Sequence, residues 1–486
     1  IMNYAKDWQL ESSYTDLPEQ LYTKINPVPV DTPKLLLVNE ELAKSLGIKL
    51  DLDDKVMLAN LFSGNVLPKN VHPIAQAYAG HQFGQFSILG DGRAHLLGEK
   101  ISTDGKRYDI QFKGSGQTPY SRGGDGRAAV GPMLREYLIS EAMHALKIPT
   151  TRSLAVVSTG ESIMRSSLLD GAILTRVASS HIRIGTFEYA QRMLDYNQLK
   201  KLADYAIERH YPEILDHENT YLSFLNAVIE RQAKLVASWM HIGFIHGVMN
   251  TDNMSISGET IDYGPCAFMD IFSMERVFSS IDYRGRYKYG SQAHAAHWNL
   301  SRLADSLLPL LHQDMDEAIK LAEASLASYS QIFNDAWISG MRSKLGIYNE
   351  EVEDLSLIQK LLDWMQTEKV DYTKTFYNLS QESLPHNEMF SSKGFQEWQT
   401  LWQARLAKNS MSLKSSVKMM QANNPVIIPN NYHVEEALKA SEEGEFKAFL
   451  TLLEALKKPF EATILNEPYR NATVNPIPNY QTFCGT

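Results

Sequence analysis

The chain has 486 residues, which is too long for one ordinary hydrophobic core, so its length suggests roughly two to four domains or lobes. Hydrophobic residues make up 44% and charged residues 21%, the composition of a globular protein without long disordered segments. The formal net charge of −10 disfavours a nucleic-acid partner, because a phosphate backbone requires a clustered positive surface.

The lack of a recognisable targeting signal and the low number of cysteines both favour a cytoplasmic protein. No apolar run reaches the roughly 18 residues of a membrane-spanning helix, so no membrane association is expected. The first fifteen residues mix charged and polar groups and match neither a signal peptide nor a basic transit peptide. Only Cys266 and Cys484 are present, which excludes a disulfide framework and suits a reducing compartment.

The pattern of residues along the chain predicts an α+β protein with four regions. Residues 1–70 read as an N-terminal extension with a helix at 40–46, and residues 71–165 as a strand-rich lobe interrupted by one helix. Residues 166–350 read as a helical lobe, with helices at 221–242 and 306–336 and a strand-like interruption at 247–270. Residues 351–486 read as a helical C-terminal region, in which a proline-marked extended segment at 424–429 separates two helices. The motifs must decide among the folds that share this order.

A glycine-rich loop lies at residues 88–99, where Gly90, Gly92 and Gly98 fall between two expected strands. Glycines allow backbone N–H groups to approach a phosphate closely, and Arg93 adds a positive charge. Glycine pairs in hairpins are more often turn residues, so this motif alone decides nothing.

The strand expected at 107–113 ends in Lys113, after the hairpin signal Asp-Gly at 104–105. Its apolar residues alternate with Asp109, Gln111 and Lys113, so Lys113 lies on the face opposite the apolar triplet. The helix expected at 133–147 carries Glu136 in its first turn. Kinases fix an ATP-binding strand lysine with a helix glutamate in this order. A solvated lysine and a surface glutamate are the plainer alternative.

The loop between that strand and helix reads YSRGGDGR at residues 120–127. Three glycines, two arginines and one aspartate over eight residues are unusual for a plain loop in an acidic protein. Guanidinium groups suit polyphosphate binding because they offer a bidentate fork. A purely structural loop remains the alternative.

The segment IHGVMNTDNMSI at 245–256 and the triplet Asp-Tyr-Gly at 262–264 follow a long amphipathic helix. Counted from His246, Asn253 and Asp262 occupy the two metal-binding positions of the kinase pattern, whereas the position of the kinase base is Val248. Valine accepts no proton, so the usual kinase arrangement is not supported. Asp252 is an available carboxylate, and Asn253 with Asp262 could hold Mg²⁺ or Mn²⁺ on phosphates.

These motifs identify a resemblance to the selenoprotein O family, also called YdiU, a family of protein adenylyltransferases with a protein-kinase-like, bilobal pseudokinase fold. The resemblance runs over nearly the whole chain. It rests on HPIAQAYAGHQFG at 72–84, QFKGSGQTPYSR at 111–122, GDGRAA at 124–129, the segment 246–264, residues 424–429 and the Cys484 tail.

The resemblance implies that ATP binds in an orientation flipped relative to kinases, with its α-phosphate toward a Ser, Thr or Tyr hydroxyl of a protein substrate. It implies that Asn253 and Asp262 hold Mg²⁺ or Mn²⁺, that Asp252 accepts the proton and that Glu136 pairs with Lys113. It implies nucleotide contacts from Gly90, Gly92, Arg93, Lys113, Asp125, Gly126, Arg176, Arg183 and Asp262. Arg176 and Arg183 carry no signal of their own, because arginines seven residues apart are normally surface charge.

The family often carries selenocysteine near its C-terminus, a position occupied here by Cys484. We hypothesise that Cys484 forms a reversible disulfide with Cys266 and so couples redox state to activity. Two unrelated thiols are the alternative.

Three other functions stay open on the sequence. One is uridylyl transfer from UTP with Mn²⁺ through the same site. Another is ordinary kinase activity with Asp252 as the base. The third is a catalytically inactive ATP-binding scaffold. The sequence does not select the protein substrate, the acceptor residue, Mg²⁺ over Mn²⁺, or the oligomeric state.

Overall fold

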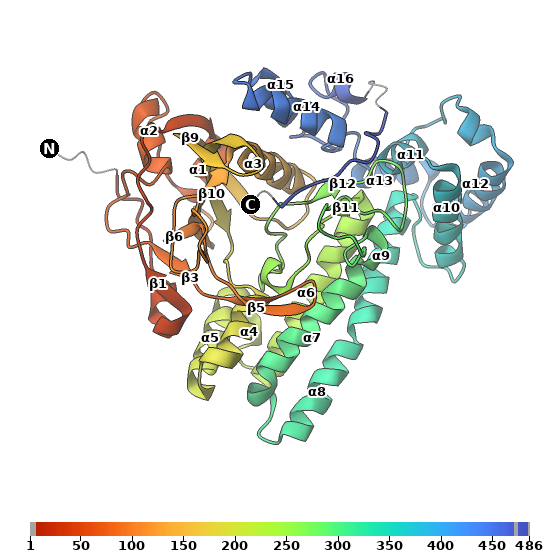
Figure 1. Cartoon of the computed structure of the whole chain (residues 1–486). Helices are drawn as coiled ribbons and strands as arrows, with labels where there is room; N and C mark the ends of the chain where they lie inside the picture. Colours follow the sequence, from red (N-terminus) through yellow and green to blue (C-terminus); the bar gives the residue numbers. More distant parts are fainter. Residues whose placement is uncertain (1–5, 471–474, 485–486) are drawn as a thin grey trace.

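A computed structural model describes residues 6–470 and 475–484, and the architecture is α+β (Figure 1). An eight-stranded antiparallel sheet occupies one side of the molecule, and most of the helices occupy the other. Within the described part of the chain, no helix combines the length and apolar character that a bilayer crossing requires.

The sheet has the strand order β1-β3-β6-β7-β10-β9-β2, and β8 pairs with β10 outside this path. The strands are β1 (Tyr22–Lys24), β2 (Lys34–Val38), β3 (Ile74–Gln76), β6 (Ala94–Ile101), β7 (Arg107–Lys113), β8 (Ala128–Ala129), β9 (Arg152–Met164) and β10 (Leu168–Ala178). Residues 1–70, expected as an extension, thus supply an edge strand at each end of the sheet. Pairing partners this distant in sequence leave no local signal.

Both faces of the sheet are covered. The helices α1 (Glu40–Leu46) and α2 (Lys55–Phe62) pack on one face, in a core that includes Ile110 and Phe112 of β7. The helix α3 (Val130–Ala145) packs on the other face. Because side chains alternate along a strand, the polar residues of β7 lie on the α3 side.

The α3 helix corrects one expectation. It begins at Val130 rather than at residue 133, so Glu136 lies in the second turn instead of the first. Pro132 does not prevent this earlier start, because the first turn of a helix has no intrahelical partners for its N–H groups. Gly98, expected in the turn, lies within β6 at a register shift, where its backbone packs against Glu11.

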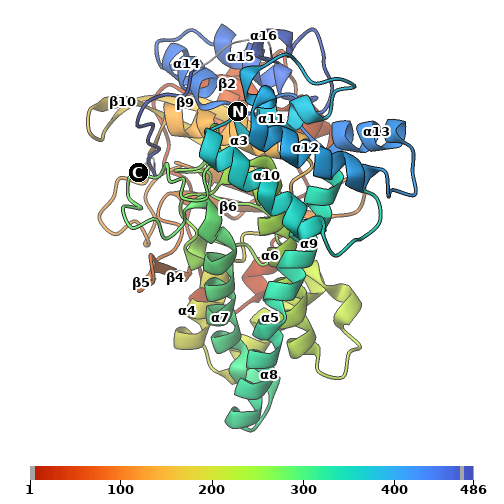
Figure 2. The same ribbon diagram turned by 90° about the vertical axis from the view of Figure 1, so that its right-hand side faces the viewer.

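The larger helical region contains α4 (Ile184–Met193), α5 (Tyr196–His210), α6 (Thr220–Ile242), α7 (Gln292–Leu311), α8 (Met315–Ala327) and α9 (Tyr329–Lys344). The long helices α6 to α9 run side by side (Figure 2). The single helix expected at 306–336 is wrong: the chain turns at 312–314, where Asp314 accepts hydrogen bonds from the first N–H groups of α8, and again at Ser328.

The segment expected to be strand-like at 247–270 is largely irregular. It contains a short 3-10 helix at Thr251–Asn253 and the two-residue strand β12 (Ala267–Phe268), which pairs with β11 (Phe244–Ile245). A separate hairpin, β4 (Ala79–Gln82) and β5 (Gln85–Ile88), packs against α4 and this 3-10 helix. Irregular backbone here leaves side chains free to face the sheet.

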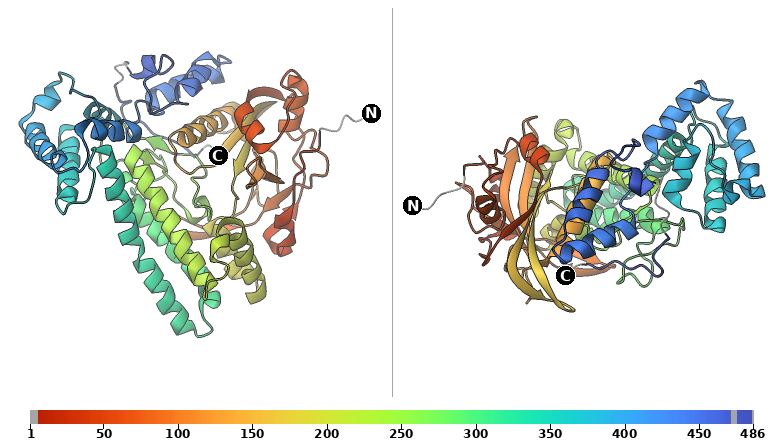
Figure 3. Two further views of the ribbon diagram at one scale, coloured as in Figure 1. Left: turned by 180° about the vertical axis from the view of Figure 1, so that it is seen from behind. Right: turned by 90° about the horizontal axis from the view of Figure 1, so that it is seen from above.

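The C-terminal region comprises α10 (Asp354–Glu368), α11 (Tyr372–Leu379), α12 (Lys393–Leu406), α13 (Leu413–Asn423), α14 (Asn431–Glu442), α15 (Lys447–Ala455) and α16 (Glu467–Arg470). The helices α10, α12 and α13 extend away from the sheet, whereas α14 and α15 return to pack near α3 (Figure 3). The segment 424–429 separates α13 from α14, as the prolines predict. The last described residues then run back along residues 278–280.

Candidate active site

A cavity of about 340 Å³ lies between the sheet and the irregular segment that follows α6. Most of the residues singled out in the sequence line it, although they come from segments far apart in the chain. They are Gly92, Arg93, Lys113, Arg176, Arg183, Asp252, Asn253, Asp262 and Cys484. Cationic side chains and carboxylates therefore share one small, mostly buried space.

Asp262 is the centre of this charge cluster. Arg176 Nη1 lies 2.7 Å from its Oδ1 and Lys113 Nζ lies 3.6 Å from the same atom, while Arg183 donates to Oδ2. Although burial alone would raise the pKa of Asp262, Arg183, Arg176 and Lys113 hold it well below its usual range. Asp262 is therefore a carboxylate at any physiological pH.

Backbone geometry aims this carboxylate. Asp262 has φ of +64°, in the left-handed region that only a few per cent of residues other than glycine adopt. On the sheet side, Arg176 of β10 lies opposite Gln111 of β7, two residues from Lys113. The cluster thus depends on the register of β7 and β10 and on one strained residue, and strain of this kind concentrates at functional sites.

Lys113 also contacts Glu136. The Glu136 carboxylate oxygen lies 3.0 Å from Lys113 Nζ and 3.7 Å from Arg176 Nη1, and its side chain is 1% exposed. Burial tends to raise the pKa of Glu136, but Lys113 and Arg176 lower it overall. Burial also lowers the pKa of Lys113. The pair resembles the strand-lysine and helix-glutamate arrangement of kinases in its contacts.

Asp252 and Asn253 lie on the 3-10 helix Thr251–Asn253 at the cavity wall. The Asp252 side-chain oxygen Oδ1 is buried without a hydrogen-bond partner among the described residues. Burial raises the pKa of Asp252 to about 7, although the Arg183 cation opposes this shift. A carboxyl group with this pKa can accept a proton near neutral pH.

The backbone around Asp252 is held on two sides. Its carbonyl oxygen accepts a hydrogen bond of 2.7 Å from Arg183 Nη1. Its side chain lies against the backbone of Gly80 in β4. The β4–β5 hairpin therefore forms a wall of the site, and sequence reasoning assigned this hairpin no role.

The same hairpin region contributes aromatic residues to the cavity. Tyr78 and Phe83 line it, and the Arg183 guanidinium lies 4.6 Å from the Tyr78 ring centroid. Asp91, also missed, lies between the two glycines of the loop, and burial raises its pKa to about 6. The sequence at 72–84, which includes Tyr78 and Phe83, indicated a role only through its resemblance to the family.

Three residues assigned to nucleotide contact do not line this cavity. Gly90 packs against the Tyr120 ring, where an added Cβ would lie 2.6 Å from Cγ. Asp125 pairs with Arg165 at 2.8 Å, and Gly126 packs on the backbone at residue 116. Gly90 and Gly126 thus leave room for neighbouring chain segments, and residues 91–94 carry the loop into the cavity.

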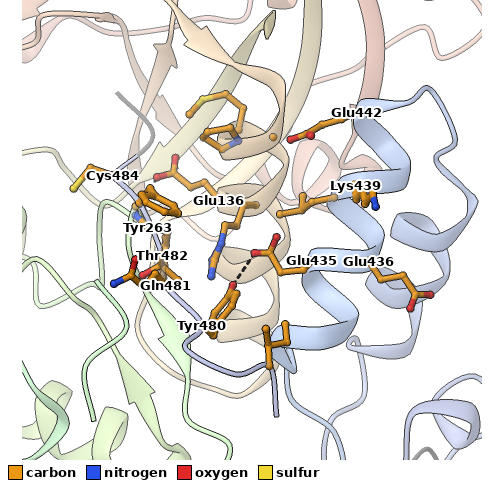
Figure 4. Close-up of a pocket in the computed structure, with 18 of the residues that line it drawn as sticks. Glu136, Tyr263, Glu435, Glu436, Lys439, Glu442, Tyr480, Gln481, Thr482 and Cys484 are labelled. Atoms are coloured by element: carbon orange, nitrogen blue, oxygen red, sulfur yellow. Dashed lines mark hydrogen bonds between the residues drawn. The ribbon is translucent and has the colours of Figure 1, made fainter. Parts of the chain in front are cut away.

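A larger cavity of about 840 Å³ adjoins the first and shares Arg93, Lys113, Gly264 and Cys484 with it. Figure 4 shows its walls: α3, α14 and the chain from 477 to 484. Tyr480 donates a hydrogen bond of 2.7 Å to Glu435 and so links the C-terminal segment to α14. Together the two cavities provide a smaller end that holds the Asp262 cluster and a larger end between α3, α14 and the C-terminal segment.

Cys266 and Cys484 are both free thiols. Cys266 is buried, and burial raises its pKa to about 11; burial also raises the pKa of Cys484. The backbone of Cys484 lies about 3.5 Å from the position of a Cβ on Gly264, two residues before Cys266. The C-terminal cysteine therefore lies at the site, and the disulfide stays a prediction.

The donors available to a divalent cation are few. The described residues contain no group of three or more His, Cys, Asp and Glu side chains arranged to hold a metal ion. Asn253 Nδ2 donates to the Val248 carbonyl at 2.9 Å, which leaves the amide oxygen as its ligand atom on the cavity side. Asn253 and Asp262 both line the cavity, and their oxygen donors fit the chemistry of Mg²⁺ or Mn²⁺. Both Asp262 oxygens also accept hydrogen bonds from arginines.

Comparisons with known proteins agree over the whole chain. A family model described as "Protein adenylyltransferase SelO" matches residues 5–457. The chain is 55% identical to a "Protein nucleotidyltransferase YdiU" of Bacillus cereus (strain AH187), with 100% of this chain and 99% of the relative covered. It is 54% identical to the protein so named in Brevibacillus brevis, covering 99% and 98%, and 53% identical to that in Nitrosococcus oceani, covering 99% and 97%.

Proposed function

The chain belongs to the protein adenylyltransferase SelO family, and from this premise we propose that it transfers AMP from ATP to Ser, Thr or Tyr hydroxyls of other proteins. Membership makes the chain an enzyme of a nucleotidyltransferase family. The proposal adds the nucleotide, the acceptor groups and the residues that act on them, within a protein-kinase-like arrangement of a strand-rich and a helical lobe.

The observation that carries the proposal is the position of Asp252 beside the Asp262 cluster. Arg93, Lys113, Arg176 and Arg183 give one end of the cavity a surplus of positive charge, which suits a triphosphate. Asp252 is a buried carboxylate with a pKa near 7 at the same cavity, while Val248 occupies the position of the kinase base. This combination of a buried carboxyl group and cationic side chains supports transfer without the usual kinase base.

In the proposed reaction the acceptor hydroxyl oxygen attacks the α-phosphorus of ATP. A new oxygen–phosphorus bond forms, the bond to the bridging oxygen of the β-phosphate breaks, and pyrophosphate leaves. Asp252 takes the hydroxyl proton. Lys113, Arg176 and Arg183 neutralise phosphate charge, which is the main requirement of such transfers.

A divalent cation held by Asn253 and Asp262 would supply further charge neutralisation when bound. Glu136 keeps Lys113 directed toward the cavity, and Arg176 and Arg183 keep the Asp262 carboxylate fixed. Asp125 and Gly126 would meet the nucleoside only if the loop at 120–127 moves toward the cavity on binding. Their assignment to the nucleotide rests on the resemblance and not on the cavity lining.

The test uses ATP labelled at the α- or the γ-phosphate, with purified protein, Mg²⁺ or Mn²⁺ and a generic protein acceptor. The proposal predicts label on protein from the α position only, and none with Asp262→Ala. Label from the γ position only would establish a kinase with Asp252 as the base. ATP binding without label from either position would establish a scaffold.

The nucleotide itself needs a separate comparison, because the relatives are named nucleotidyltransferases without a stated nucleotide. Labelled UTP with Mn²⁺ replaces ATP in the same assay, and each unlabelled nucleotide competes against the other. We expect ATP to compete with UTP and to give the faster transfer. Faster transfer from UTP would make the protein a uridylyltransferase.

A further inference from the structure

A chain of buried polar residues continues from the Asp262 cluster into the sheet, and the proposed reaction gives it no role. Arg176, 2% exposed, directs each of its three nitrogens at a different partner. Nη1 donates to Asp262 at 2.7 Å and Nη2 donates to Gln111 at 2.9 Å. Nε lies 3.3 Å from His181 Nε2. The Arg176 guanidinium is therefore held by Asp262 within the cluster and by Gln111 and His181 outside it.

The contact with His181 fixes where the imidazole carries its proton. Arginine Nε always bears a hydrogen in proteins, so His181 Nε2 must be the acceptor and the ring must be neutral with its proton on Nδ1. Burial lowers the pKa of His181 to about 4, which is consistent with a neutral ring.

Asp109 contacts the other ring nitrogen of His181, Nδ1. Its Oδ2 lies 2.8 Å from His181 Nδ1 and accepts the His181 backbone N–H at 3.0 Å. Its Oδ1 accepts a hydrogen bond of 2.6 Å from Arg209 of α5. Every partner of this carboxylate is a donor, so Asp109 accepts only and selects the tautomer with the proton on Nδ1.

We propose that His181, held in one tautomer by Asp109, is a positioning residue that fixes the Arg176 guanidinium in the active site. The inference rests on the proposed function in so far as Arg176 acts on the nucleotide. Partners of this kind, one step removed from the reacting groups, commonly change affinity or activity roughly 10- to 100-fold in metal sites.

The arrangement follows from strand geometry. Asp109, Gln111 and Lys113 alternate on one face of β7, and Arg176 lies opposite Gln111 on β10. One strand face thus supplies a direct partner for Arg176, an indirect partner through His181, and the lysine of the cluster.

A matched pair of variants at residue 181 tests the proposal. His181→Gln keeps an acceptor near the Nε2 position, whereas His181→Leu has similar bulk and no acceptor. We expect His181→Leu to lower kcat/KM for ATP roughly 10- to 100-fold and His181→Gln to retain most of the wild-type value. Equal values for the two variants, whether both high or both low, would overturn the proposal.

Asp109→Asn supplies a second test should His181→Leu fail to fold. An asparagine must turn its NH₂ group toward either His181 or Arg209. Toward His181 it meets the Nδ1–H and the backbone N–H, and toward Arg209 it meets the guanidinium, so either orientation places donors against donors. We expect kcat/KM to fall as in His181→Leu. Wild-type kinetics in Asp109→Asn would overturn the proposal.

Two readouts separate this inference from the proposed function. The affinity for ATP with Mg²⁺, measured by calorimetry, compares the 181 variants without any transfer reaction. The ¹⁵N chemical shifts of the His181 ring, assigned by its loss in His181→Gln, report the tautomer without any nucleotide. An Nε2-protonated ring in the wild-type protein would overturn the inference about His181 even if AMP transfer is established. An Nδ1-protonated ring in a protein that transfers no AMP would overturn the proposed function alone.

Discussion

A Cβ atom on residue 80 would lie 2.9 Å from the Asp252 Cγ atom, so the backbone of Gly80 is in direct contact with the Asp252 carboxyl group. Gly80 does not adopt the left-handed conformation, so a larger residue there is excluded by the space that Asp252 occupies and not by the backbone. The hairpin and the proposed base therefore fit together only with glycine at this position.

Gly80→Ala is expected to displace Asp252 and to lower kcat of transfer about 10-fold or more, since a misplacement near 1 Å can cost 100-fold. ATP affinity should change less than kcat, because Arg176 and Lys113 of the Asp262 cluster do not contact Asp252, whereas Arg183 does. The measurement compares kcat and the ATP dissociation constant with those of the control Gly394→Ala on α12. A Cβ atom added at residue 394 would lie 3.3 Å from Trp364 Cδ1, its nearest neighbour. Equal kcat in the two variants would show that the hairpin does not position Asp252.

The second prediction concerns pH. Burial raises the pKa of Asp252 to about 7, and a base acts only when deprotonated. Transfer should therefore rise with pH up to about 7 and level off above it. Asp252→Asn should lower kcat by roughly 10²- to 10⁴-fold and remove this rise, with ATP still bound. A pH profile that Asp252→Asn leaves unchanged in shape would assign the ionisation to another group.

Asn253 provides the third prediction, which concerns the metal. Its amide oxygen is one of two protein ligands proposed for the cation, so Asn253→Ala should increase the Mg²⁺ concentration needed for half-maximal transfer about 10-fold or more. ATP affinity measured in the presence of a chelator should match the wild-type value. An unchanged Mg²⁺ requirement would exclude Asn253 from the metal site.

The fourth prediction concerns the two cysteines. Hydrogen peroxide should convert the Cys266 and Cys484 thiols to one disulfide, with loss of two hydrogens from the protein and reduction of the peroxide to water. The reaction should be slow, because burial raises the pKa of both thiols. Intact-mass analysis and thiol labelling before and after oxidation measure it, with Cys484→Ser as the control. Two free thiols after prolonged oxidation would remove the hypothesis.

Much of the local structure was predictable from sequence. The alternation along 107–113 identifies β7 and separates Lys113 from the apolar face, and the spacing between His246, Asn253 and Asp262 selects the residues that reach the cavity. The long apolar periodicity of α6 gives its extent to within one residue. In each case the signal lies within one element or one short loop.

The rest of the site depends on contacts between distant segments. Arg176 meets Asp262 because β10 pairs with β7 in one register, and Arg183 meets it where residue 183 bridges Ser255. Nothing near either arginine in the sequence reports these pairings. The β4–β5 hairpin acquires its role only by packing against residues about 170 positions later, as in the hydrogen bond from the His81 backbone to Thr251. The break before α8 was predictable in principle, because Asp314 is a typical helix N-cap.

The most direct test of the central claim identifies both products of one reaction. Purified protein is incubated with ATP, Mg²⁺ and an acceptor protein; mass spectrometry then measures the acceptor, and the solution is assayed for pyrophosphate and ADP. We predict acceptor that has gained AMP, one pyrophosphate for each AMP transferred, and neither product with Asp262→Ala. Acceptor that has gained phosphate, with ADP in place of pyrophosphate, would contradict this prediction.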